Sequence, residues 1–197
     1  MQQVLIIHGG SSFNSYESYI RDLRDSPLKY EKLLPQQKWK PWIAEQMPDA
    51  DVLLPTLPNS KNAVYEEWKI YFEKILPYLD LENTQLVGHS LGAMFLAIYL
   101  NETTLAKRVK RLILVSPAYA DESVEELGSF KVTSAKHAMD SAEELHLFHS
   151  QDDPVVPYTE LAKFELDLPS AIVHRFNSRG HFSDPTFPEL LELLKQK

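Results

Sequence analysis

Cysteine is absent from this chain of 197 residues, and its absence removes a whole range of chemistry. A disulfide framework, a cysteine nucleophile, cysteine-ligated zinc and iron–sulfur clusters are all excluded. Basic residues are also scarce, since 20 Lys and Arg stand against 28 Asp and Glu, for a formal net charge of −8. A surface with this balance repels phosphate groups, and the sequence shows no local basic patch, so we expect no nucleic-acid partner.

Long apolar runs are missing as well. The most apolar stretch, residues 86–100, is broken by Gly88, His89 and Ser90, and it is shorter than the roughly 18–20 residues of a membrane span. The first residues, M-Q-Q-V-L-I-I-H-G-G, contain neither the basic region nor the long apolar core of a secretory signal. We therefore expect a cytoplasmic protein without a membrane partner.

The remaining composition is that of an ordinary globular protein. Hydrophobic residues make up 44% and charged residues 24% of the chain, which excludes a disordered or fibrous protein. The length predicts one domain over residues 1–197, with room for a sheet covered on both faces and none for a separate lid domain. Glycine is scarce, and five of the six glycines fall in the clusters H-G-G, G-H-S-L-G and R-G-H. Such grouping indicates places where a Cβ atom would collide with neighbouring backbone.

Six short runs rich in branched aliphatic residues predict β-strands. The first and fourth runs, V-L-I-I-H and L-I-L-V-S, are almost continuously apolar, as expected for strands buried on both faces of a parallel sheet. The predicted strands are residues 4–8, 51–54, 85–88, 111–116, 145–149 and 171–176, and the predicted helices are residues 62–79, 91–101, 159–166 and 187–195. This alternation predicts an α/β fold, a three-layer α/β/α sandwich around a mainly parallel sheet.

Two segments interrupt this alternation. The first, residues 11–38, contains a helical pattern that stops before Pro27, and the second is residues 117–139. Both are longer than the usual loops of α/β proteins, and such excursions favour a pocket wall or a mobile flap over surface decoration. The aromatic residues that are candidates for a pocket wall are Tyr16, Tyr19, Tyr119 and Phe130.

The segment Gly88-His89-Ser90-Leu91-Gly92 matches the pattern G-x-S-x-G. It directly follows a predicted strand and opens a predicted helix, the context that a nucleophile elbow requires. A serine in this tight turn has a strained backbone and an exposed hydroxyl, and the start of the helix directs free N–H groups at the reacting centre. We therefore predict Ser90 as the nucleophile.

A serine nucleophile needs a base, and the base needs an orienting acid. His181 follows the last predicted strand, and Asp152 and Asp153 follow the strand before it. The carboxyl ends of parallel strands share one edge of a sheet, so these side chains are expected near Ser90. We favour Asp153 as the acid, because the proline-bounded turn D-P-V-V-P would fix its direction, and expect Asp152 to cap the turn.

Two backbone N–H groups are needed to stabilise the oxyanion. We predict that Leu91 supplies one and that the loop after the first strand supplies the other, from Gly10 or, as second choice, Ser11. Ser11, His89 and Tyr119 are candidates for contact with substrate.

Four other histidines, His137, His146, His149 and His174, are interpreted as structural or surface residues. His146 and His149 would point to opposite faces of one strand, and no H-E-x-x-H pattern or carboxylate cluster is present. We predict neither a metal nor a cofactor.

The chain resembles the α/β-hydrolase superfamily, and more narrowly the small serine hydrolases of the retinoblastoma-binding and YdeN types. The resemblance rests on I-I-H-G-G, M-P-D, L-V-G-H-S-L-G, S-Q-D-D-P-V-V-P and G-H-F, which together span nearly the whole chain. It implies a minimal fold with strand order 2-1-3-4-5-6 and no full lid, and the triad Ser90, Asp153 and His181. Residues 12–38 look like an insertion relative to the shortest members. Retinoblastoma binding does not carry over, because its usual short motif needs a cysteine.

The expected function is hydrolysis of a small carboxylic ester or related acyl substrate through an acyl-enzyme on Ser90. Alternatives are action of the same triad on a thioester or small peptide amide, or a non-catalytic protein-binding member of the fold. The expected partner is therefore a small acyl compound, and the sequence does not indicate an oligomeric state.

Overall fold

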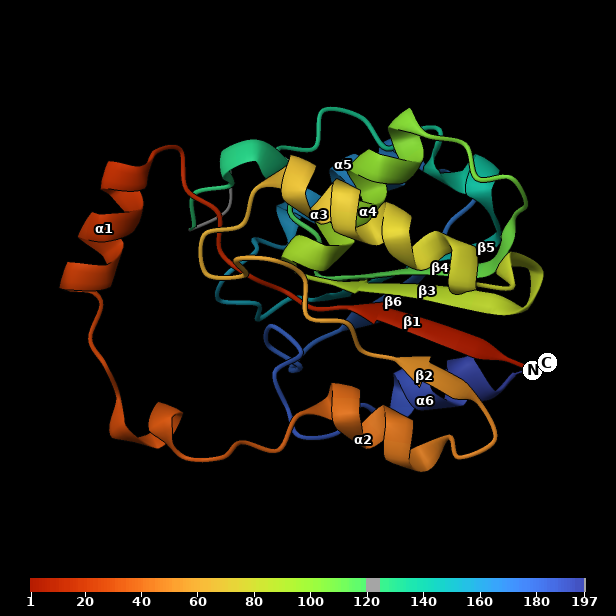
Figure 1. Ribbon diagram of the computed structural model, residues 1–197, viewed down its shortest axis with the longest axis horizontal. Helices are drawn as coiled ribbons and strands as arrows, with labels where there is room; N and C mark the ends of the chain where they lie inside the picture. Colours follow the sequence, from red (N-terminus) through yellow and green to blue (C-terminus); the bar gives the residue numbers. More distant parts are fainter. Residues whose placement is uncertain (120–124, 197) are drawn as a thin grey trace.

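A computed structural model describes residues 1–119 and 125–196, and it contains a six-stranded parallel sheet in the order β2-β1-β3-β4-β5-β6 (Figure 1). The strands are β1 Gln3–Ile7, β2 Asp51–Leu53, β3 Thr84–His89, β4 Val109–Val115, β5 Ala142–Ser150 and β6 Ile172–Phe176. The α-helices are α1 Tyr16–Asp25, α2 Trp39–Gln46, α3 Tyr65–Ile75, α4 Leu91–Glu102, α5 Thr159–Asp167 and α6 Pro188–Lys195. The predicted fold class and strand order are confirmed.

Helices cover both faces of the sheet. Helices α3, α4 and α5 lie on one side, and α2 and α6 lie on the other (Figure 1). The larger apolar core, under α3 and α4, is centred on the fully buried rings of Trp68, Phe72 and Phe95. The smaller core joins α2 and α6 to the other face of the sheet. The central strands are therefore buried on both faces, which explains their unbroken apolar runs.

Helix α4 is the central helix of the larger core. It is apolar on all sides, and nine of its residues are buried, as expected for a helix surrounded by protein. Its first turn lies against the end of β1, because a Cβ atom on Gly92 would be 2.5 Å from the His8 carbonyl oxygen and 2.6 Å from that of Ile7. The main chains of α4 and β1 are so close at Gly92 that no side chain fits there.

Helix α2 is the one α-helix of the described residues that the sequence analysis did not predict. It is eight residues long and contains Pro41, which usually indicates a break. Here Pro41 lies in the first turn, where a missing N–H group costs nothing, and Trp39 and Ile43 are buried one turn apart. The apolar stripe is two residues long, too short for a periodicity argument.

Helix α1 forms where the pattern predicts it and ends at Asp25, before Pro27, with Ser15 as its N-cap. Its apolar side chains do not enter the core: Tyr16 is 66% and Leu23 56% exposed. Helix α1 and residues 26–38 extend beyond the carboxyl edge of the sheet as an arm (Figure 1). No helix in the described part of the chain is both long and apolar enough to cross a membrane.

We predict that Gly92→Ala lowers the free energy of unfolding by about 1–3 kcal/mol, the usual cost of adding a methyl group to a filled core. In an unobstructed helix the same change adds about 1 kcal/mol of stability. The sign of the change in the free energy of unfolding therefore tests the contact between α4 and β1. Urea unfolding followed by circular dichroism measures it. A variant as stable as the parent protein would contradict the prediction.

Candidate active site

Ser90 occupies a sharp turn between β3 and α4. Its backbone has φ 54° and ψ −121°, a conformation that costs a non-glycine residue free energy and that clusters at functional sites. The turn is held by the Ser90 N–H, which donates to the Val115 carbonyl at 2.8 Å, and by the Ser90 carbonyl, which accepts from the Ala93 N–H at 2.9 Å. A Cβ atom on Gly88 would be 2.5 Å from the Ala93 Cα atom, so both flanking glycines are required by close backbone contacts.

His181 and Asp153 form a hydrogen-bonded pair at the same edge of the sheet. The His181 Nδ1 atom lies 2.8 Å from Asp153 Oδ2 and 3.1 Å from Oδ1. The Asp153 side chain is fully buried, and its Oδ1 atom also accepts from the N–H groups of Val155 and Val156 at 2.9 and 3.0 Å. An ionised Asp153 accepts a hydrogen bond from the Nδ1–H group, which leaves the Nε2 atom of His181 free to accept a proton.

Burial by itself would raise the pKa of Asp153. The hydrogen bond and charge of His181, with the two backbone N–H groups of the turn, outweigh burial and lower the pKa below its ordinary value. Asp153 is therefore a carboxylate at neutral pH.

Asp152 has a different environment from Asp153. Its Oδ1 atom accepts from the Ser150 hydroxyl at 2.5 Å and from the Gly180 N–H at 2.9 Å. The Ser150 hydrogen bond, and after it the Gly180 hydrogen bond, lower the pKa of Asp152. The structure thus places Asp153 against the imidazole and Asp152 against the backbone of the loop before it.

The loop after β1 brings Gly10 next to Leu91. A Cβ atom on Gly10 would be 3.3 Å from the Leu91 Cδ2 atom and 2.5 Å from the Ser60 carbonyl oxygen. The Ser11 N–H already donates to the Ser60 carbonyl at 2.9 Å. Within residues 1–119 and 125–196, neither the Gly10 nor the Leu91 N–H donates a hydrogen bond to another backbone group outside the regular elements, so both can donate to a bound molecule.

A narrow cavity of about 20 Å³ lies directly beside Ser90, lined also by Gly10, Leu91, Met94 and Val156. It adjoins a larger cavity of about 500 Å³ beneath α1. The residues that line both are Ser12, Glu125 and Glu126.

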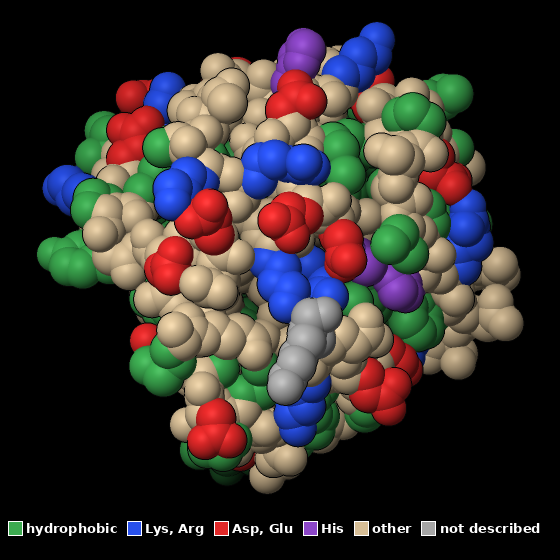
Figure 2. Space-filling view, turned by 90° about the vertical axis from the view of Figure 1, so that its right-hand side faces the viewer, with side chains coloured by type: hydrophobic (Ala, Val, Ile, Leu, Met, Phe, Trp, Pro, Cys, Tyr) green, Lys and Arg blue, Asp and Glu red, His purple; other side chains and the backbone are tan. Residues whose placement is uncertain are grey.

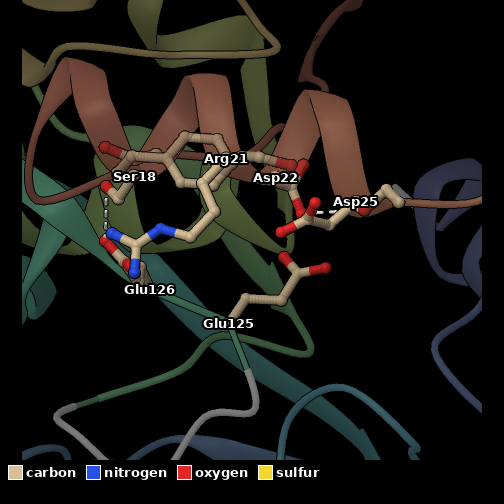
Figure 3. A pocket seen from close by; sticks show the side chains of 10 residues that line it. Ser18, Arg21, Asp22, Asp25, Glu125 and Glu126 are labelled. Carbon is tan, nitrogen blue, oxygen red and sulfur yellow. Dashed lines mark hydrogen bonds between the residues drawn. The ribbon is translucent and has the colours of Figure 1, made fainter.

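The larger cavity is strongly acidic. Asp22 and Asp25 of α1 line it together with Glu125 and Glu126, and among the described lining residues Arg21 alone is basic. Figure 3 shows the Arg21 side chain reaching toward Glu126, with the other carboxylates around the same space. Glu126 accepts hydrogen bonds from the Asn14 N–H and the Ser18 hydroxyl. The opposite edge of the sheet, seen in Figure 2, instead shows acidic and basic side chains interspersed.

The candidate substrate contacts lie in different places. Ser11 lines the acidic cavity. The Tyr119 hydroxyl donates to Asp167 at 2.7 Å, and burial, followed by this hydrogen bond, raises the pKa of Tyr119 to about 12. Tyr119 therefore packs on α5 and is absent from the described lining of both cavities beside Ser90. The interpretation of Phe130 as a pocket wall is wrong, because its ring is fully buried against Trp68.

The ring of His89 is enclosed by residues of the protein. Its Nε2 atom lies 2.9 Å from the His181 carbonyl oxygen, and its Nδ1 atom lies 3.1 Å from the Lys40 ammonium. Lys40 belongs to α2, so the sequence analysis missed it together with that helix.

Of the other histidines, His146 and His174 contact each other at 3.0 Å, and the His149 ring is buried beside Ser150. Among the described residues, no group of three or more histidine and carboxylate side chains is arranged to hold a metal ion.

The chain is similar in sequence to known hydrolases. Residues 33–188 match the family described as Serine hydrolase. Serine hydrolase RBBP9 of Rattus norvegicus is 30% identical over 165 residues, which cover 80% of this chain and 84% of the rat protein. The YdeN hydrolase of Bacillus subtilis is 29% identical over 154 residues, which cover 73% of this chain and 77% of that protein.

Solved structures show the same fold. The crystal structure of the ydeN gene product from B. subtilis aligns with a TM-score of 0.78 at 23% identity, covering 98% of this chain and 97% of that one. The thioesterase domain from the curacin biosynthetic pathway aligns with a TM-score of 0.63 at 15% identity, covering 99% and 91%. These neighbours are α/β-hydrolases. With the family match extending over most of its residues, the chain belongs to the serine hydrolase family.

Proposed function

We propose that this protein hydrolyses small carboxylic esters through an acyl-enzyme on Ser90, with His181 as general base and Asp153 as the orienting acid. The observation that carries the proposal is the buried Asp153–His181 pair at the same edge as the strained turn at Ser90. The His89 and His181 ring centroids are 5.2 Å apart, and His89 immediately precedes Ser90. The His181 loop therefore lies beside the turn that contains Ser90, which supports the proposal.

In the first step, the Ser90 Oγ atom attacks the acyl carbon while His181 Nε2 takes the hydroxyl proton. A bond forms from Oγ to carbon, and the carbonyl electron pair moves to oxygen. Asp153 keeps the Nδ1–H proton directed at itself, so that Nε2 is the basic nitrogen, and it stabilises the imidazolium that forms. The N–H groups of Leu91 and Gly10 donate to the oxyanion.

Collapse of this intermediate expels the alcohol, which takes the proton from His181. Water then attacks the acyl-enzyme with His181 again as base, which releases the carboxylic acid and restores Ser90. The same groups would act on a thioester or a small peptide amide, since only the leaving group differs. A non-catalytic role is the alternative from another class, and it predicts no covalent step.

We predict that a fluorophosphonate probe labels the protein at one serine, and that Ser90→Ala abolishes this labelling. The probe needs a serine activated by a base, so Ser170→Ala, at an exposed turn, serves as the control that keeps full labelling. Asp153→Asn and His181→Ala are expected to lower kcat for p-nitrophenyl esters by about 10³-fold or more. Mass spectrometry locates the adduct, and labelling that persists in Ser90→Ala would refute the assignment.

We further predict that a negative charge on the substrate lowers its turnover. The carboxylates of the adjoining cavity repel an anionic group by about 1 kcal/mol or more, which corresponds to a five- to tenfold lower kcat/KM. The matched substrates are p-nitrophenyl esters of succinate, butyrate and 4-(trimethylammonio)butyrate, assayed at low and high salt. The order of kcat/KM is expected to be cationic, then neutral, then anionic.

The double variant Asp22→Asn, Asp25→Asn should reduce the difference in kcat/KM between the cationic and the anionic ester. Glu17→Gln is the control and should leave that difference as it is. Glu17 is an exposed acid on the same helix that is absent from the described cavity lining. Equal turnover of all three esters by the parent protein would show that the acidic cavity does not face the substrate.

A further inference from the structure

The loop that carries His181 is held on one side by the end of β5. The Arg179 N–H donates to the Ser150 hydroxyl oxygen at 2.9 Å, and the Gly180 N–H donates to Asp152 at 2.9 Å. Ser150 in turn donates to Asp152. The backbone immediately before His181 is thereby fixed to the same turn that contains Asp153.

On its other side, the loop is held by two side chains from elsewhere in the chain. The Trp39 indole N–H donates to the Phe182 carbonyl at 2.9 Å. His89 Nε2 lies 2.9 Å from the carbonyl oxygen of His181 itself. A carbonyl only accepts, so the His89 Nε2 atom carries a proton and donates it.

This assignment leaves the Nδ1 atom of a neutral His89 with a lone pair, which accepts from the Lys40 ammonium at 3.1 Å. Burial, and after it the charges of Lys40 and His181, keep the pKa of His89 well below its ordinary value. Burial, followed by the charge of Lys38, lowers the pKa of Lys40 to about 8. A neutral imidazole beside an ammonium group is therefore the state at neutral pH.

Lys40 is an unusual residue for this position. Its contacts are the His89 nitrogen and the Trp39 ring, whose centroid lies 4.3 Å from the ammonium. Over residues 1–119 and 125–196, no carboxylate forms an ion pair with it. Lys40 is half-buried, and a cation partly withdrawn from water without a carboxylate partner is costly, so stability alone does not account for its placement.

We propose that Lys40 and His89 are positioning residues that hold the His181 imidazole in reach of Ser90. His89 and Ser90 are consecutive, so a bond from His89 to the His181 carbonyl joins the nucleophile turn directly to the loop that carries the base. Lys40 fixes the orientation and tautomer of the His89 ring by occupying its other nitrogen. The inference rests on the proposed function, since a positioned base matters only if Ser90 is acylated.

The experiment compares His89→Ala, His89→Gln and Lys40→Met with the parent protein on a neutral p-nitrophenyl ester. His89→Ala should lower kcat about 10- to 100-fold with KM within about twofold, because a misplaced base slows the chemical step and leaves binding unchanged. His89→Gln should recover at least a third of the parent kcat, since its amide N–H reaches the position of the imidazole Nε2–H. Lys40→Met should lower kcat about three- to tenfold.

Lys32→Met is the matched control. It removes the same charge from an exposed side chain eight residues before Lys40, and its kcat should equal that of the parent protein. The rate of fluorophosphonate labelling at Ser90 should fall in parallel with kcat in the His89 and Lys40 variants. Thermal unfolding identifies any variant that is not folded. If His89→Ala does not fold, Lys40→Met serves in its place.

The outcomes distinguish failure of the proposed function from failure of the positioning role. Absence of labelling and of esterase activity in the parent protein would overturn the proposed function itself. A parent protein that is labelled, with a folded His89→Ala that reacts at the same rate, would overturn only the positioning role. A fall in kcat that His89→Gln does not recover would also overturn it, because loss of packing rather than of the hydrogen bond would then be the cause.

Discussion

The close contact between the start of α4 and the ends of β1 and β3 is the constraint on which the rest of the site depends. No side chain fits at Gly88 or Gly92, because a Cβ atom there would lie within 2.6 Å of neighbouring main-chain atoms. This contact allows the strained backbone of Ser90, with φ at 54°. It also sets Leu91 beside Gly10, and in the proposed mechanism the N–H groups of these two residues stabilise the oxyanion.

The Asp153–His181 pair is held by contacts of its own and is linked to the Ser90 turn through His89. The Asp153 side chain is buried, and its oxygens accept from backbone N–H groups and contact His181, so its charge is stabilised within the folded protein. The His181 loop is hydrogen-bonded to Ser150 of β5 on one side and to Trp39 of α2 and His89 on the other. Preorganisation of this kind spares the enzyme reorganisation during the reaction.

Most of the fold was predictable because its signals are local. The buried parallel strands are unbroken apolar runs, and the turn at Ser90 is a short motif between a strand and a helix. Helix α2 was not predicted, because its apolar stripe is two residues long and it contains Pro41. Phe130 was misassigned because an aromatic residue in a long excursion has no local pattern that separates an inward from an outward ring.

By itself the sequence determined the layered α/β architecture and a candidate for each catalytic role, because hydrophobic periodicity and turn motifs act over a few neighbouring residues. Only the tertiary structure decided that Asp153 faces His181, that His89 bonds to the His181 carbonyl and Lys40, and that acidic residues of α1 and Glu125 line one cavity. These contacts join segments far apart in the chain. Their geometry depends on how helices pack on the sheet, which no single stretch of sequence encodes.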